Sequence, residues 1–205
     1  MRLGLLGGTF DPIHIAHLWM AEHARDALSL DRVLLIPAER PPHKPDSPIP
    51  PFEVRYRMVE LGIGESPGLV VSRIEEGVEP SFTVETLERV ARLHPGAELW
   101  LVIGGDSLRD LPTWREPEEI VRRARLAVLP RPVEGGAAFE ALPPVPAGAR
   151  VDWLDGPRLD LSSTALRRRV QRGESIRFLV PEPVRAYIEA SGLYRDSSRS
   201  GEASR

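Results

Sequence analysis

The stretch LGLLGGTFDPIHIAH, residues 3–17, joins a short apolar run to two glycines and two histidines three positions apart. An apolar run that ends in glycine, as this one does after Leu6, is typical of a buried strand in a parallel sheet. From Ile15 onward the apolar residues recur at helical spacing. The stretch therefore predicts a strand, a tight turn and a helix, and the rest of the chain continues the alternation.

Strands and helices are expected to alternate up to residue 190. Strands are predicted at 2–6, 32–36, 69–72, 98–103, 126–129 and 151–154, and helices at 15–28, 52–61, 82–93, 116–123, 162–171 and 181–190. This order predicts an α/β, Rossmann-like, doubly wound fold: a mostly parallel sheet of five to six strands with helices on both faces. We expect one domain over residues 1–195 and a polar, disordered tail over 196–205. The segment 130–150, rich in Pro, Gly and Ala, is long for a loop.

The composition of the 205 residues argues against several classes of protein. A net charge of -3 argues against a nucleic-acid binder that relies on bulk charge. The absence of cysteine excludes disulfides and thiolate metal sites. The apolar run at the N-terminus is too short for a secretion signal or a membrane span. We therefore expect a cytoplasmic protein without nucleic-acid or membrane partners.

The basic residues are almost all arginine. Lys44 is the sole lysine among the 27 basic residues, and the chain has 21 prolines and no asparagine. A heat-loving source or the codon bias of a GC-rich genome would each explain this composition. Lys44 closes the motif PPHK, residues 41–44, in which prolines stiffen a loop and present His43 and Lys44 as two cations. The alternative is a surface loop that happens to contain a lysine. A lysine in a chain that otherwise uses arginine favours a functional role for Lys44.

The two glycines could form part of a phosphate site. Gly7 and Gly8 lack a Cβ, so their backbone N–H groups can approach an oxyanion closely. The helix that follows adds its positive end, and His14 and His17 share one face there. A plain glycine turn with two surface histidines is one alternative. A two-histidine metal site is another, although no third ligand stands at a suitable spacing.

Two further motifs could contact a nucleotide. In LSSTALR, residues 161–167, the hydroxyls of Ser162, Ser163 and Thr164 can cap a helix while Arg167 reaches back towards the same spot. A routine cap with a basic, solvated helix face is the alternative. Trp114 follows the glycines that end the fourth predicted strand, and it could stack on a ring or pack in the core.

Seven motifs, taken in order, resemble the nicotinate-nucleotide adenylyltransferase family of the nucleotidyltransferase superfamily. They are GGTFDPIHIAH (7–17), PPHK (41–44), RYRM (55–58), SFTVETL (81–87), IGGDSLRDLPTW (103–114), LSSTALR (161–167) and FLVPEPVRAYIEASGLY (178–194). The resemblance spans nearly the whole chain. Ala16, Phe82 and Glu85 stand where the family mostly has Gly, Tyr and Asp, and none of these changes removes a charged group from the expected site.

The resemblance implies transfer of AMP from ATP to nicotinate mononucleotide, giving deamido-NAD and pyrophosphate in NAD biosynthesis, with Mg²⁺ carried in on ATP. The catalytic residues it implies are His14, His17 and Arg167. The ATP contacts it implies are Gly7, Gly8, Thr9, Phe10, His14, His17, Gly104, Asp106, Ser162, Ser163, Thr164 and Arg167. The mononucleotide contacts it implies are His43, Lys44, Ser81, Phe82, Thr83 and Trp114.

Three other functions compete with this one. A sibling adenylyltransferase acting on pantetheine phosphate or nicotinamide mononucleotide would share the ATP half of the site. A nucleotide-sensing protein with an inert site would bind ATP without turnover. A Rossmann dehydrogenase fits poorly, because GLLGGTF is not G-x-G-x-x-G and no acidic residue follows the second strand at the required place.

Overall fold

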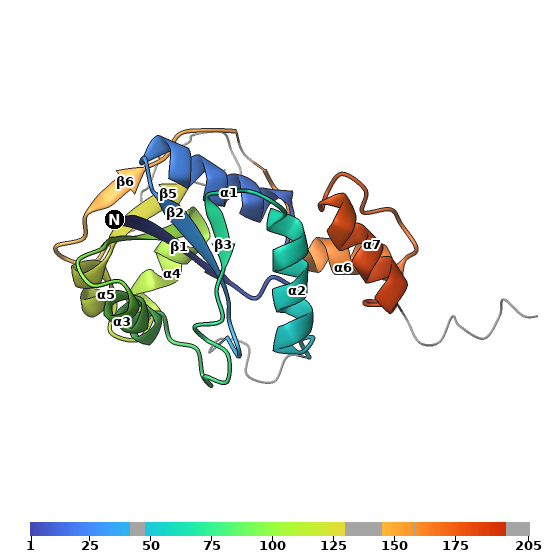
Figure 1. The fold of residues 1–205 in the computed structure, drawn as a ribbon, viewed down its shortest axis with the longest axis horizontal. Helices are drawn as coiled ribbons and strands as arrows, with labels where there is room; N and C mark the ends of the chain where they lie inside the picture. Colours follow the sequence, from blue (N-terminus) through green and yellow to red (C-terminus); the bar gives the residue numbers. More distant parts are fainter. Residues whose placement is uncertain (42–47, 130–144, 158, 196–205) are drawn as a thin grey trace, which may run out of the picture.

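Six parallel strands form one sheet in the order β3-β2-β1-β4-β5-β6 (Figure 1). The computed structural model describes residues 1–41, 48–129, 145–157 and 159–195. The strands are β1 (Arg2–Gly8), β2 (Arg32–Pro37), β3 (Leu69–Val71), β4 (Glu98–Gly104), β5 (Arg125–Leu129) and β6 (Val151–Trp153). Every pairing in the sheet is parallel. The predicted fold class is confirmed.

Helices cover both faces of this sheet, and the last two helices lie beyond the second one, away from the strands (Figure 1). The helices are α1 (Ile15–Ala27), α2 (Phe52–Ile63), α3 (Thr83–Leu93), α4 (Gly105–Asp110), α5 (Pro117–Arg123), α6 (Ser163–Gln171) and α7 (Glu182–Ser191), with a 3₁₀ turn η1 at Leu111–Thr113. The six predicted helices are present within two residues at each end. The helix α4 and the turn η1 were not expected, because the glycines before them and Pro112 indicate a turn.

Alternate strand residues face two hydrophobic cores. Leu3 and Leu5 of β1 pack into one core with α3, α4 and α5, whereas Leu6 packs into the other with α1, α2, α6 and α7. This follows from the strand geometry, in which successive side chains point to opposite faces. A parallel sheet covered on both faces needs apolar residues throughout, which is why the strands read as continuous apolar runs.

The strand order reverses between β1 and β4. From β1 the chain builds outward through β2 and β3, and it then returns to add β4, β5 and β6 on the other side. Ligands of open α/β sheets bind at such a reversal, outside the carboxyl ends of the strands. Here those ends are Gly8 and Gly104. The fold thus brings the two predicted glycine motifs to neighbouring positions.

Several sequence-based expectations fall outside the described residues. These are His43, Lys44, most of the segment 130–150 and the tail 196–205. Among the described residues, no helix is long and apolar enough to span a membrane.

A buried guanidinium fixes the loops beside the carboxyl end of β1. Arg55 of α2 is only 1% exposed. It donates hydrogen bonds to the carbonyls of Thr9 (3.1 Å), Ala38 (2.6 Å), Glu39 (3.1 Å) and Pro50 (2.9 Å). Burial lowers the pKa of Arg55, but a guanidinium stays charged at any ordinary pH. Arg55 therefore ties the ends of β1 and β2 to the start of α2.

Replacing Arg55 by methionine should destabilise the fold, because four partly buried carbonyls would lose the donor that satisfies them. We expect a loss of about 3 kcal/mol in the free energy of unfolding, measured by urea denaturation. Arg57→Met on the same helix is the matched control, since Arg57 pairs with Glu60 at the exposed surface and should change stability little. Equal losses in the two variants would contradict the role given to Arg55.

Candidate active site

The loop between β1 and α1 has the shape expected of a nucleotide site. Gly7 is exposed, and a Cβ added to it would meet no atom within 4 Å. A Cβ on Gly8 would lie 3.1 Å from the ring of Phe10, a buried residue with a positive φ of 50°. The protein's own packing therefore leaves little room for a side chain at position 8 but does not restrict one at position 7. The open space beside Gly7 lets a ligand come close to the backbone.

The two predicted histidines lie against each other at the start of α1. Their ring centroids are 3.7 Å apart and the ring planes differ by 20°. Phe10 contacts His17 edge-on at 5.1 Å. His14 is 2% exposed and His17 is half-buried, so the alternative of two ordinary surface histidines is wrong. Stacked imidazoles at a helix start present their N–H groups from one place, as a phosphate site needs.

The start of α6 docks on this loop. The Ser163 hydroxyl donates to the Pro12 carbonyl at 2.9 Å, and Arg167 Nη1 donates to the Asp11 carbonyl at 2.8 Å. Arg167 Nη2 also bonds Thr164 Oγ1 at 3.3 Å. The bonds to Pro12 and Asp11 join residues more than 150 positions apart. The structure thus brings the two predicted phosphate motifs together.

The helix starts themselves are partly satisfied within the protein. Ser162 caps α6, as predicted, by accepting a hydrogen bond from the Ala165 amide at 3.2 Å. The first amide of α1, on Ile15, donates to the Leu179 carbonyl at 3.1 Å. The segment before α7 therefore packs on the start of α1.

Asp11 is a functional candidate that sequence reasoning missed. It is 4% exposed, and its carboxylate accepts a hydrogen bond from Tyr194 at 2.6 Å and lies 3.5 Å from Arg167. Burial, followed by the Asp11 charge, raises the pKa of Tyr194, so the phenol keeps the proton that it donates. Asp11 and Tyr194 each lie in one of the sequence motifs, but no sequence pattern indicates that the two side chains are in contact. Asp11 therefore anchors the loop after β1 to Tyr194 and to Arg167.

The acceptor half of the expected site lies at the start of α3 and after η1. Phe82 is the N-cap of α3 and Thr83 is its first residue, while Trp114 ends η1. Phe82 and Trp114 are half-buried against the same core, and the Arg115 guanidinium lies 4.6 Å from the Phe82 ring. Trp114 therefore packs partly in the core and stays partly exposed.

Gly104 and Asp106 flank the start of α4. Gly104 is buried as its N-cap, and Asp106 is exposed in its first turn. The structure places both next to the carboxyl end of β4, close to the strand-order reversal.

Ser81 is turned into the protein. It is 7% exposed, and its hydroxyl accepts a hydrogen bond from the Glu39 amide at 3.0 Å and donates to the Val78 carbonyl at 3.1 Å. Ser81 thus links the end of β2 to the segment before α3. Its predicted contact with the substrate stays a prediction, and the hydroxyl serves the protein's own structure.

Metal-binding side chains do not cluster in the described part of the chain: no three His, Asp or Glu residues there are grouped to hold an ion. The Asp11 carboxylate beside the loop is engaged by Tyr194 and Arg167.

Solved structures with the same fold include nicotinic acid mononucleotide adenylyltransferase from Plasmodium falciparum. Its complexes with NaAD and with APC match with TM-scores of 0.76 and 0.74, each at 18% identity over 94% of this chain. They cover 97% and 96% of the Plasmodium chains. At this identity the likeness concerns the fold alone.

Sequence relatives identify the family. A cytidylyltransferase-like family model matches residues 5–169. A probable nicotinate-nucleotide adenylyltransferase of Thermus thermophilus is 46% identical over 197 residues, which cover 95% of this chain and all of the relative. One from a Roseiflexus species is 47% identical over 94% of this chain and 98% of the relative. The chain therefore belongs to the cytidylyltransferase-like family and, within it, to the nicotinate-nucleotide adenylyltransferases.

Proposed function

We propose that this protein transfers AMP from ATP to nicotinate mononucleotide, releasing pyrophosphate and forming deamido-NAD in NAD biosynthesis. The observation that carries the proposal is the docking of α6 on the loop after β1, through Ser163 to Pro12 and Arg167 to Asp11. This docking puts a guanidinium and a capped helix start beside the stacked imidazoles of His14 and His17. We place the reaction in the cytoplasm, where ATP is available.

The ATP half of the site lies at the carboxyl ends of β1 and β4. The backbone of Gly7, Gly8, Thr9 and Phe10 would hold phosphate oxygens together with His14 and His17. The hydroxyls at the start of α6 (Ser162, Ser163 and Thr164), with Arg167, would hold the β- and γ-phosphates. Gly104 and Asp106 would face the adenosine. The mixture of amides, imidazoles and a guanidinium suits a triphosphate, because each supplies N–H donors to charged oxygens.

The acceptor half of the site recognises a carboxylate and a pyridine ring. Backbone N–H groups near Phe82 and Thr83, at the positive end of α3, would receive the nicotinate carboxylate. The exposed part of Trp114 would stack on the ring. His43 and Lys44, which lie outside the described residues, would bind the mononucleotide phosphate.

The reaction needs alignment and charge neutralisation rather than a protein nucleophile. A phosphate oxygen of the mononucleotide attacks the α-phosphorus of ATP, the bond from that phosphorus to the bridging oxygen breaks, and pyrophosphate leaves. The attacking oxygen is already anionic, so no general base is required. Mg²⁺ bound to ATP would neutralise part of the triphosphate charge. His14, His17 and Arg167 would stabilise the charge that builds up on the leaving pyrophosphate.

A pyrophosphate-release assay with two acceptors tests the assignment. Nicotinate and nicotinamide mononucleotides are compared at equal concentration with ATP, and we expect the acid to give the higher kcat/KM. A preference for the amide, or turnover only with pantetheine phosphate, would assign a sibling activity. Binding of ATP without pyrophosphate release for any acceptor would indicate a sensing protein.

Gly7→Ala should separate function from stability. The added methyl meets no protein atom, so the urea midpoint should stay the same or rise slightly. The methyl would occupy the space given to the nucleotide, and we expect KM for ATP to rise roughly tenfold, equivalent to about 1.4 kcal/mol of binding. Gly8→Ala is the contrast, because its methyl presses on the Phe10 ring and should lower stability as well. An unchanged KM for ATP in Gly7→Ala would place the nucleotide elsewhere.

His17→Ala should lower kcat far more than it raises KM for ATP, because the imidazole acts on charge that develops in the transition state. We expect a loss of about 100-fold in kcat, measured by steady-state pyrophosphate release. His94→Ala, at the far end of α3, is the control and should keep wild-type kinetics. Wild-type turnover in His17→Ala would remove this residue from the mechanism.

A further inference from the structure

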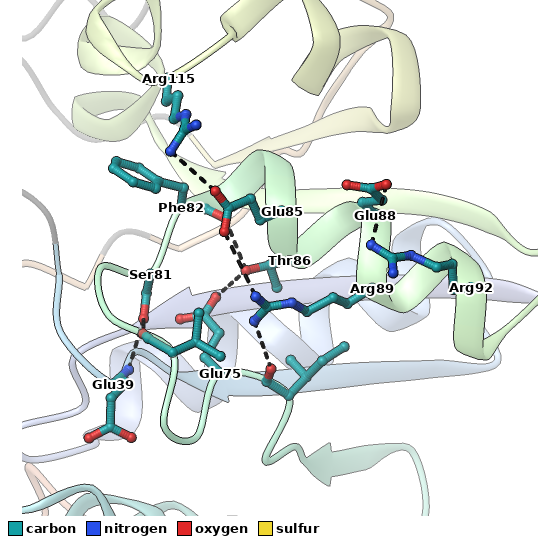
Figure 2. Close-up of polar contacts among 12 residues, drawn as sticks. Glu39, Glu75, Ser81, Phe82, Glu85, Thr86, Glu88, Arg89, Arg92 and Arg115 are labelled. Carbon is teal, nitrogen blue, oxygen red and sulfur yellow. Dashed lines mark hydrogen bonds and ion pairs between the residues drawn. The ribbon is translucent and has the colours of Figure 1, made fainter.

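A buried polar network lies directly behind the start of α3 (Figure 2). Glu75, in the segment between β3 and α3, is 6% exposed. Its carboxyl group is hydrogen-bonded to the hydroxyl of Thr86, in the first turns of α3, and lies near that of Ser81, just before the helix. Ser81 in turn accepts from the Glu39 amide at the end of β2. Glu75 thus connects both sides of the α3 start to the body of the protein.

A protonated Glu75 would supply a proton for every hydroxyl contact around it. The Thr86 hydroxyl lies within hydrogen-bond distance of the Glu75 carboxyl and of the Phe82 carbonyl (3.2 Å), and the Ser81 hydroxyl donates to the Val78 carbonyl. Each hydroxyl carries one proton. A proton on Glu75 that is donated to Thr86 Oγ1 frees the Thr86 proton for Phe82, and all of these contacts become hydrogen bonds at once.

The surroundings of Glu75 act on the pKa of its carboxyl group in both directions. Burial raises the pKa of Glu75, against the opposing effects of the two hydroxyls and of the two guanidinium groups that face it, Arg89 on α3 and Arg55 on α2. Arg55 is itself bound to backbone carbonyls.

The other acid at this helix start is neutralised by ion pairs. Glu85 lies in the first turn of α3, 3.2 Å from Arg115 and 3.8 Å from Arg89 (Figure 2). An unpaired negative charge in this turn would compete with an anionic ligand for the positive end of the helix. With Glu85 paired and Glu75 protonated, the start of α3 keeps its positive potential.

We propose that Glu75 is a positioning and specificity residue, held in its protonated form, that fixes the start of α3 for a carboxylate ligand and adds no competing charge. The proposal rests on the proposed function, in which this helix start receives the nicotinate carboxylate. Glu75 acts through Ser81 and Thr86 on the backbone of Phe82 and Thr83, without touching the substrate.

Two substitutions of Glu75 test this role in the pyrophosphate-release assay. Glu75→Gln keeps the shape and can donate to Thr86 Oγ1, so KM for nicotinate mononucleotide should stay within twofold of wild type. Glu75→Ala removes the support, and we expect that KM to rise at least tenfold and the preference over nicotinamide mononucleotide to fall, with KM for ATP unchanged. A merely structural role would raise both KM values together or only lower stability.

Thr86 gives a second, milder test in case Glu75→Ala folds poorly. Thr86→Val removes the hydroxyl at nearly constant volume and should raise KM for nicotinate mononucleotide in the same way, whereas Thr86→Ser keeps the hydroxyl and should behave as wild type. Urea denaturation of all four variants shows which of them are folded.

Infrared difference spectra of the folded protein test the protonation state directly. At neutral pH the wild type minus Glu75→Gln spectrum should contain the carbonyl band of a protonated carboxylic acid. Absence of that band, a Glu75→Gln variant as impaired as Glu75→Ala, or equal changes in both KM values would each overturn the proposal. Failure of the proposed function is distinguishable, because the wild type itself would then make no deamido-NAD.

Discussion

The candidate site depends on hydrogen bonds that three distant side chains donate to the carbonyls of one loop. Arg55, Ser163 and Arg167 bond the carbonyls of Thr9, Pro12 and Asp11, in the loop that follows β1. Buried carbonyls need such partners, and a guanidinium supplies several N–H groups in a fixed plane. Holding the backbone in this way keeps open space beside Gly7, at the end of β1. The bonds from Ser163 and Arg167 also fix α6 against the loop. The same contacts therefore set the geometry of the candidate site and the packing of α6.

Control of negative charge is common to both halves of the site. A protein that binds polyanions must hold its own carboxylates in a neutral or paired state nearby. Asp11 is bonded by Tyr194 and lies beside Arg167, Glu85 lies between Arg115 and Arg89, and we infer that Glu75 keeps its proton. Each acid thereby shapes the backbone without repelling a substrate. The arginine-rich composition supplies the partners, since a guanidinium can bond a carboxylate and carbonyls at once.

Local sequence patterns predicted the sheet, six helices and the phosphate motifs because these depend on neighbours in the chain. The strands are apolar runs of a covered parallel sheet, and Ser162 caps α6 through a residue three positions away. The pattern failed at α4, where glycines and a proline indicate a turn although the chain continues as a helix packed through Leu108. Tertiary packing there outweighs intrinsic propensity.

The sequence by itself determined that the protein is a doubly wound α/β domain with glycine, histidine and serine motifs at strand and helix ends. Only the tertiary structure decided which side chains support those motifs. Tyr194 meets Asp11 across 183 positions and Arg55 meets Thr9 across 46, and no local pattern encodes such pairs. The fold alone also decides that the Ser81 hydroxyl turns inward, where it accepts from the Glu39 amide and donates to the Val78 carbonyl. The physical reason is that burial makes every polar group find a partner, and the fold alone fixes which partner is near.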